Sequence, residues 1–135
     1  MLEIGSFPFL IKKGKMYIML ITTKSGKSWI LPKGQPESHL SHEKVAALEC
    51  FEEAGLVGKV LAKKSLHKKF KMKKNDKFLV YPFYIYKILD EWEESSIRKR
   101  RLVKVKEALK LVTRKEHRKA IKYFISKEVS HKLHS

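Results

Sequence analysis

The segment 42–54 carries a helix signal at each end and no residue between them that would break a helix. Ser41 is a good N-cap, and Gly55 suits the left-handed residue that ends many helices. The residues between them include no glycine or proline and supply alanine and glutamate, which favour helix. The sequence therefore predicts a helix over 42–54, and any fold of this chain must bury one face of it.

The two faces of this predicted helix differ in chemistry. Since each residue turns the helix by about 100°, three carboxylates fall on one arc and four small side chains on another. The carboxylates are Glu49, Glu52 and Glu53, and the small residues are Ala46, Ala47, Cys50 and Ala54. The small face lets the helix lie close to a sheet, and the acidic face suits a hard ion such as Mg²⁺. A solvated acidic surface is the commoner explanation of such a pattern taken without context.

The remaining segments predict a single α/β domain over residues 1–135. The chain is long enough to bury a core, and an apolar share of 43% excludes a disordered composition. Segments rich in apolar, aromatic and β-branched residues predict strands, and Pro82 suggests a bulge or an unpaired edge in one of them. We expect strands at 6–12, 15–23, 28–31, 57–72 (one or two), 78–89 and 99–104, a loop at 32–39, helices at 106–112 and 115–129, and doubtful order at 130–135.

The formal charge of +17 is concentrated in the second half of the chain. Residues 1–58 have 7 lysines and 6 acidic residues, net +1, whereas residues 59–135 have 24 lysines and arginines against 8 acidic residues, net +16. Alternation in 66–73 places Lys69 and Lys71 on one cationic strand face. Such a field attracts polyanions, but it does not choose among nucleic acid, anionic lipid and polyphosphorylated small molecules.

A single cysteine, Cys50, excludes an internal disulfide and a cysteine zinc site, which indicates a reducing compartment. No apolar stretch approaches the roughly 20 residues that span a bilayer. The N-terminal segment begins with an acidic residue and is broken by Pro8, unlike a signal peptide. We therefore expect a soluble cytoplasmic protein without a membrane partner, and we predict no oligomeric state.

The stretch 31–58, LPKGQPESHLSHEKVAALECFEEAGLVG, resembles the Nudix box. That pattern has Gly, five residues, Glu, seven residues, Arg-Glu-apolar-any-Glu-Glu-any-Gly-apolar, and here it spans 34–56. The residues in register are Gly34, Glu49, Cys50, Glu52, Glu53, Gly55 and Leu56. The resemblance implies a Nudix fold, in which a mixed β-sheet is sandwiched between α-helices (an α/β/α sandwich), and a hydrolase that cleaves phosphoanhydride bonds.

The same resemblance implies a Mg²⁺ site, with Mn²⁺ as a substitute, formed by the Gly34 carbonyl and the three glutamates of the helix. Glu49, Glu52 and Glu53 are then the candidate catalytic residues, with Glu53 the first choice as ligand and Glu49 as ligand or base. The general base varies in position across the family, so Glu93 and Glu94 remain further candidates. The chemistry implied is metal-assisted transfer of a phosphoryl or nucleotidyl group to water.

Two box positions depart from the pattern, since Leu40 replaces its first Glu and Leu48 replaces its Arg. In the family these two residues pair as a salt bridge. An apolar pair can replace a buried ion pair without loss of stability, whereas losing one partner leaves an unpaired charge. We hypothesise that Leu40 packs on Leu48 and braces the loop without charge; the alternative is a site that has decayed.

After the box, the sequence resembles the diphosphoinositol polyphosphate phosphohydrolases through an acidic loop with tryptophan, a basic cluster, a short strand and a helix. The matching residues are Trp92, Glu93, Arg98, Lys99, Arg100, Glu107 and Ala108, whereas Leu102 replaces a usual Trp. This group hydrolyses diphosphoinositol polyphosphates and dinucleoside polyphosphates. The candidate phosphate-binding residues are Lys33, Lys69, Lys71, Arg98, Lys99 and Arg100.

Two other functions remain open. The basic second half would also suit the 5′-triphosphate end of RNA as a substrate. It would equally suit a catalytically inactive Nudix-fold protein that binds nucleic acid.

Overall fold

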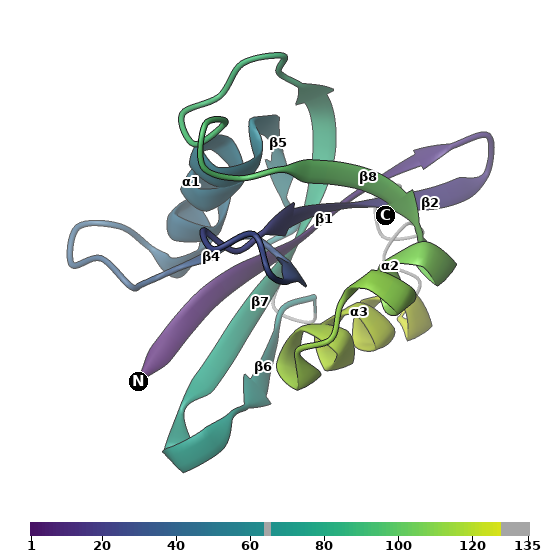
Figure 1. Cartoon of the computed structure of the whole chain (residues 1–135). Coiled ribbons are helices and arrows are strands. Elements are labelled where there is room, and N and C mark those ends of the chain that lie inside the picture. The colour runs from purple at the N-terminus through teal and green to yellow at the C-terminus, as the bar shows by residue number, and fades with distance from the viewer. Residues whose placement is uncertain (64–65, 128–135) are drawn as a thin grey trace.

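The computed structural model describes residues 1–63 and 66–127, in which four strands precede the first helix and two helices follow the last strand (Figure 1). The strands are β1 (Leu2–Lys12), β2 (Lys15–Thr22), β3 (Trp29–Ile30), β4 (Lys33–Gly34), β5 (Leu56–Val60), β6 (Lys68–Lys71), β7 (Lys77–Ile88) and β8 (Arg100–Lys104). The helices are α1 (His42–Ala54), α2 (Val105–Leu111), α3 (Lys115–Ser126) and a short 3₁₀ turn, η1 (Lys73–Asn75). None of these helices combines the length and the hydrophobicity that a membrane span needs.

The strands join into one mixed sheet with the order β3-β2-β1-β7-β5. β4 adds to β1, β6 to β7 and β8 to β2. β1 and β7 run parallel from the pair Leu2 and Lys77 to the pair Phe9 and Tyr84, and the other strand pairs are antiparallel. The longest strands therefore lie at the centre, as their nearly continuous apolar sequences require.

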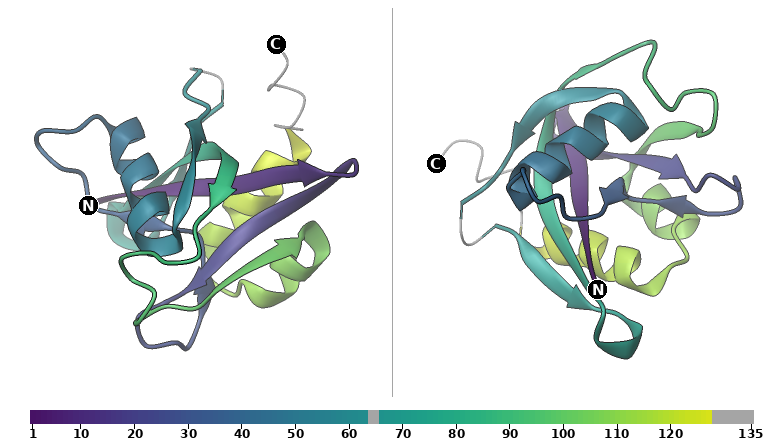
Figure 2. Two further views of the ribbon diagram at one scale, coloured as in Figure 1. Left: turned by 90° about the horizontal axis from the view of Figure 1, so that it is seen from above. Right: turned by 90° about the vertical axis from the view of Figure 1, so that its left-hand side faces the viewer.

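Both faces of this sheet are buried, because helices cover it on each side (Figure 2). Phe7 and Phe9 of β1 belong to a cluster with Ala120 and Phe124 of α3. Ser6, which points the other way, contacts the Cys50 thiol of α1 at 2.8 Å. Alternate residues of one strand thus face different helices, and the predicted α/β/α sandwich is confirmed.

Three expectations about local structure need correction. The expected loop at 32–39 begins with a short strand, β4, which pairs with β1. Pro82 lies in the central strand β7 rather than at an edge, beside β1 on one side and between the partners β5 and β6 on the other. The bulge lies further along β7, at Tyr86, which is the extra residue opposite Val57 and Gly58 of β5. The last helix ends at Ser126 in the described part, and the prediction for 130–135 lies outside the described residues.

Candidate active site

Helix α1 forms over the predicted residues, and its two caps have the predicted chemistry. The Ser41 hydroxyl accepts a hydrogen bond from the Lys44 N–H at 3.2 Å. Gly55 adopts φ 66° and donates its N–H to the carbonyls of Cys50 and Phe51. A Cβ at Gly55 would lie 2.6 Å from a guanidinium nitrogen of Arg100 and 2.7 Å from the Trp92 Cβ. Glycine therefore permits both the backbone conformation and the close approach of the 89–99 segment.

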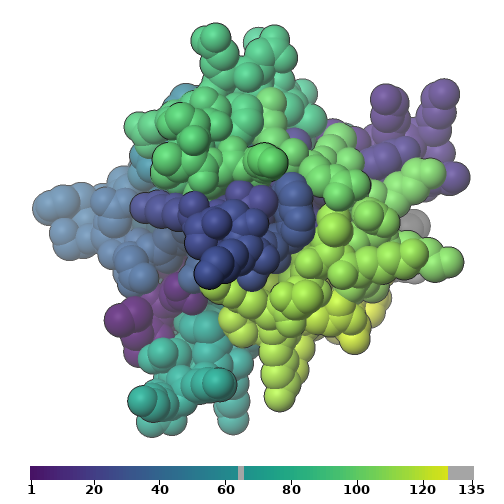
Figure 3. Space-filling view, viewed as in Figure 1, coloured from purple at the N-terminus to yellow at the C-terminus, as the bar shows by residue number. Residues whose placement is uncertain are grey.

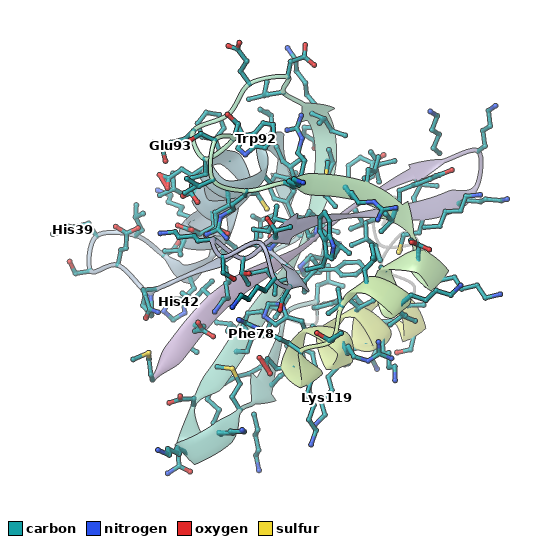
Figure 4. The ribbon with its side chains drawn as sticks, viewed as in Figure 1. His39, His42, Phe78, Trp92, Glu93 and Lys119 are labelled. Atoms are coloured by element: carbon teal, nitrogen blue, oxygen red, sulfur yellow. The ribbon has the colours of Figure 1, made fainter. Side chains whose placement is uncertain are left out.

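That segment, the acidic loop between β7 and β8, is hydrogen-bonded to the C-terminal turn of α1. The Leu89 N–H donates to the Gly55 carbonyl at 2.8 Å, and the Glu94 N–H donates to the Glu52 carbonyl at 3.1 Å. Figure 4 shows Trp92 and Glu93 of this loop beside α1. The carboxylates of the loop are thereby brought to the acidic face of the helix.

Glu53 is the most enclosed carboxylate of this region, with only 5% of its surface exposed. Its Oε1 accepts a hydrogen bond from the Lys33 N–H at 3.0 Å. Its Oε2 lies 3.3 Å from Nη2 of Arg98. Burial raises the pKa of Glu53, while the hydrogen bonds and the Arg98 charge oppose this effect. β4, α1 and the acidic loop meet at this side chain.

Glu49 lies against the glycine of the box. A Cβ added to Gly34 would be 2.6 Å from the Glu49 Cδ and 2.9 Å from its Oε1, so only glycine leaves room for this carboxyl group. The Glu49 and Glu53 side chains are hydrogen-bonded to each other. Burial, followed by this hydrogen bond and the charge of Glu53, raises the pKa of Glu49 to about 8. The two carboxyl groups therefore share a proton around neutral pH when no cation lies between them.

A second group of carboxylates adjoins this pair. One oxygen from each of Glu52, Glu93 and Glu94 lies within 4.8 Å of the others. Burial and the neighbouring carboxylates raise the pKa of Glu52. Glu94 also accepts a hydrogen bond from Arg98 Nε at 2.7 Å. We call Glu49, Glu52, Glu53, Glu93 and Glu94 the acidic cluster.

The acidic cluster fits a divalent cation on the chemistry of its donors. Hard ions such as Mg²⁺ prefer carboxylate and carbonyl oxygens. The pKa values of Glu49, Glu52 and Glu53 are all raised, partly because the carboxylates repel one another. A divalent cation would relieve that repulsion. The group whose oxygens lie within 4.8 Å of one another is Glu52, Glu93 and Glu94, so a metal-ligand role for Glu49, Glu53 and Gly34 stays a prediction.

The neutral His117 ring fixes the segment that leads into β4 and Gly34. Its Nδ1 accepts a hydrogen bond from the Leu31 N–H at 3.0 Å. Burial, with the charges of Lys33 and Arg114, lowers the pKa of His117 to about 3, so the ring is neutral and can accept. This link between α3 and the chain entering β4 helps to position Gly34, and no local sequence pattern indicates it.

The raised pKa of Glu49 predicts that the metal-free protein loses stability as the pH rises. The folded state binds this proton more tightly than the unfolded state, where the pKa is 4.5. The stabilising contribution is therefore complete below about pH 4.5 and is lost as the pH rises through about 8. Thermal unfolding in EDTA should show a falling melting temperature between about pH 5 and 9, and Glu49→Gln should flatten this slope. A melting temperature that rises across this range would contradict the assignment.

Of the predicted phosphate-binding residues, three make contacts within the protein. The Lys33 ammonium lies 2.5 Å from Oε2 of Glu3. Arg98 bonds the acidic cluster through Glu53 and Glu94. Arg100 stacks on the Trp92 ring at 3.8 Å and donates to the carbonyls of Ala54 and Leu89, which holds the acidic loop against the end of α1. Their role toward a substrate stays a prediction.

The other three candidates are exposed, but they lie in two places. Lys99 immediately precedes β8, and its N–H donates to the Thr22 hydroxyl at 3.0 Å, near the acidic cluster. Lys69 and Lys71 lie on β6, with their side chains on the exposed face as the alternation predicted. Figure 1 shows β6 at the end of the sheet away from the acidic loop. The backbone of Lys99 thus lies next to Arg98 and Thr22 at the edge of the acidic cluster, whereas the β6 lysines lie apart from it.

Leu40 was predicted to pack on Leu48, but the structure gives it different partners. Leu40 packs against a cluster that contains Ile4, Val45 and Tyr81. Leu48 is half-buried and is not among the side chains packed into the three core clusters of the described residues. Leu40 therefore anchors the loop before α1 to the sheet, and its predicted pairing with Leu48 is not seen.

Comparison with solved structures defines the fold. The chain matches the C. elegans Ap4A hydrolase in a binary complex with a TM-score of 0.76 and 15% identity, over 96% of this chain and 98% of that one. It matches the NUDIX domain of Shewanella oneidensis NrtR complexed with ADP ribose with a TM-score of 0.73 and 12% identity, over 94% and 87% of the two chains. The protein has a Nudix fold, as predicted.

The chain is also similar in sequence to plant proteins. No family model matches the sequence. Nudix hydrolase 21 of Arabidopsis thaliana, named as chloroplastic, is 32% identical over 133 residues, and Nudix hydrolase 4 of the same plant is 27% identical over 136. The matches cover 93% and 91% of this chain, which spans 66% and 64% of the length of these relatives. Relatives and structural neighbours together support the Nudix hydrolase family for this chain.

Proposed function

We propose that this chain is a Mg²⁺-dependent hydrolase that cleaves a phosphoanhydride bond in a polyphosphorylated substrate. The observation that carries the proposal is the acidic cluster, in which three glutamates of α1 meet the Gly34 loop and two further glutamates. The relatives named as Nudix hydrolases and the Ap4A hydrolase among the structural neighbours support the same class of reaction.

The residues of the cluster have distinct proposed roles. Glu53 is the principal metal ligand, because its enclosed carboxylate is oriented by the Lys33 N–H and by Arg98. Glu52 and the Gly34 carbonyl complete the set, and Glu49 acts as a ligand or as the base that removes a proton from the attacking water. When bound, Mg²⁺ supplies charge neutralisation of the anhydride and a lower pKa for that water. Glu93 and Glu94 are the alternative bases.

The proposed substrates are diphosphoinositol polyphosphates or dinucleoside polyphosphates. Both are dense in negative charge, and the formal charge of +17 would speed their arrival. Figure 3 shows the segment around β3 and β4 (dark blue) at the surface, between the acidic loop (green) above it and the α2–α3 region (yellow-green) below it. Lys33 of β4 and the exposed Lys99 before β8 are the first candidates to bind phosphate groups. The proposed location is the cytoplasm, where the free, buried Cys50 thiol would remain reduced.

A panel of substrates tests the proposal. Diphosphoinositol polyphosphates, dinucleoside polyphosphates, nucleotide sugars, ADP-ribose and triphosphate RNA are each incubated with Mg²⁺, and the products are resolved. We expect the diphosphoinositol or dinucleoside compounds to give the highest kcat/KM, with no turnover in EDTA. A higher kcat/KM for ADP-ribose or a nucleotide sugar would contradict the substrate, and no turnover of any compound would contradict the enzyme.

Two alternative functions of the same fold would also use the positive charge of the chain. One is pyrophosphohydrolase action on the 5′-triphosphate end of RNA, and the other is nucleic-acid binding without catalysis. Turnover of triphosphate RNA in the panel would identify the first. Retention on RNA that weakens steeply with salt, together with no turnover, would identify the second.

A further inference from the structure

Arg98 is an arginine that faces inward, toward carboxylates, in a strongly basic chain. Only 8% of its side chain is exposed. Nε donates to Glu94 Oε1 at 2.7 Å, Nη2 lies 3.3 Å from Glu53 Oε2, and Nη1 donates to the Thr22 carbonyl at 2.9 Å. One guanidinium therefore connects the C-terminal turn of α1, the acidic loop and the end of β2.

Helix α1 itself lacks the arginine that the box pattern places beside its glutamates. The box pattern has an arginine at position 48, directly before Glu49, and this chain has a half-buried leucine there. The helix consequently carries no cation of its own in its last two turns, since Lys44 is the only lysine or arginine from 42 to 54. Arg98 is the one arginine or lysine side chain that the described contacts place within 4 Å of a carboxylate of the acidic cluster.

We propose that Arg98 is a positioning residue that orients Glu53 toward the metal ion and holds Glu94 beside it, and that it supplies from the acidic loop the guanidinium that α1 lacks. This inference rests on the proposed function, because it assigns the cluster to a divalent cation. It also replaces the prediction that Arg98 binds substrate phosphate. Planar guanidinium donors fix the direction of each bond they make, which an ammonium does not.

The opposite effects of charge and orientation make the proposal testable. Removing a cation beside carboxylates would, by charge alone, strengthen metal binding. Removing a side chain that orients metal ligands weakens it, typically by about 10- to 100-fold. Metal affinity measured without substrate therefore distinguishes a positioning residue from a cation that merely neutralises the cluster.

The experiment is a Mn²⁺ titration of the full chain, with free Mn²⁺ followed by electron paramagnetic resonance. We expect Arg98→Ala to weaken Mn²⁺ binding by about 10- to 100-fold and Arg98→Lys to weaken it less, because lysine keeps the charge but makes fewer directed bonds. Arg101→Ala is the matched control, since it removes an exposed arginine that pairs with Glu107 outside the cluster and should leave the affinity unchanged. If Arg98→Ala does not fold, Arg98→Lys carries the same comparison against wild type.

Two outcomes would overturn the proposal. Unchanged or tighter Mn²⁺ binding in a folded Arg98→Ala variant would show that the side chain does not orient the ligands. In turnover assays, a raised KM with unchanged kcat and unchanged Mn²⁺ dependence would return Arg98 to the role of a substrate ligand. Because the titration needs no turnover, it remains informative even if none of the substrates in the panel is cleaved.

Discussion

Glu53→Gln should abolish nearly all Mg²⁺-dependent phosphate release, with kcat lower by about 10³-fold. A metal ligand supplies several kcal/mol of transition-state stabilisation, and about 1.4 kcal/mol corresponds to a factor of ten in rate. Glutamine keeps the shape of the side chain and can still accept from the Lys33 N–H, but it removes the charge that a divalent ion requires. The measurement is phosphate release under saturating substrate, with Mg²⁺ varied.

The fold of this variant should survive, which separates loss of chemistry from loss of structure. The pKa of Glu53 is raised by burial, so a neutral side chain is tolerated at this position. Glu43→Gln is the matched control, because it makes the same change in the first turn of α1, at an exposed position outside the acidic cluster. Activity of the Glu53→Gln variant within about tenfold of wild type would show that another group holds the metal.

Gly34→Ala should lower kcat by about 100-fold while the chain stays folded. The added methyl group would lie 2.6 Å from the Glu49 Cδ, so the carboxyl group must leave its place beside Glu53. Misplacement of a reacting group by about 1 Å can reduce a rate by about 10²-fold. Overpacking of this kind costs about 1–3 kcal/mol of stability, which a folded domain of this size can usually tolerate.

A glycine outside the site provides the control for Gly34→Ala. Gly14 lies at the turn between β1 and β2 with φ 76°, and a Cβ there meets nothing within 4 Å. Alanine at Gly14 therefore costs about 1–2 kcal/mol through its left-handed backbone alone. The two variants should lose similar stability in urea unfolding, but only Gly34→Ala should lose activity. Equal activity in both would mean that the Glu49 position does not matter for turnover.

The helix and its carboxylates were predictable because their signals are local. Ser41 and Gly55 cap α1 through bonds to residues within five positions, and the spacing of Glu49, Glu52 and Glu53 places them on one face whatever the rest of the fold. The alternation that put Lys69 and Lys71 on an exposed face of β6 is a property of any extended strand. Such features need only neighbours along the chain.

The partners of these carboxylates were not predictable in the same way. Glu94 joins Glu52, 42 residues away, only because the acidic loop is hydrogen-bonded to the end of α1. The proximity of Gly34 to Glu49 depends on β4 pairing with β1, and the hydrogen bond from Leu31 to His117 spans 86 residues. Arg98, Lys99 and Arg100 were all predicted to bind phosphate, yet the side chains of Arg98 and Arg100 bond within the protein while Lys99 is exposed.

The sequence by itself therefore determined the fold class, the capped helix and the acidic character of one helix face, since these depend on residue type and spacing. Only the tertiary structure decided which glutamates form one cluster, which cation balances them and which lysines lie elsewhere. The physical reason is that charge interactions and hydrogen bonds act over a few ångströms of space. Long-range strand pairing, which brings distant segments within that range, leaves no local pattern in the chain.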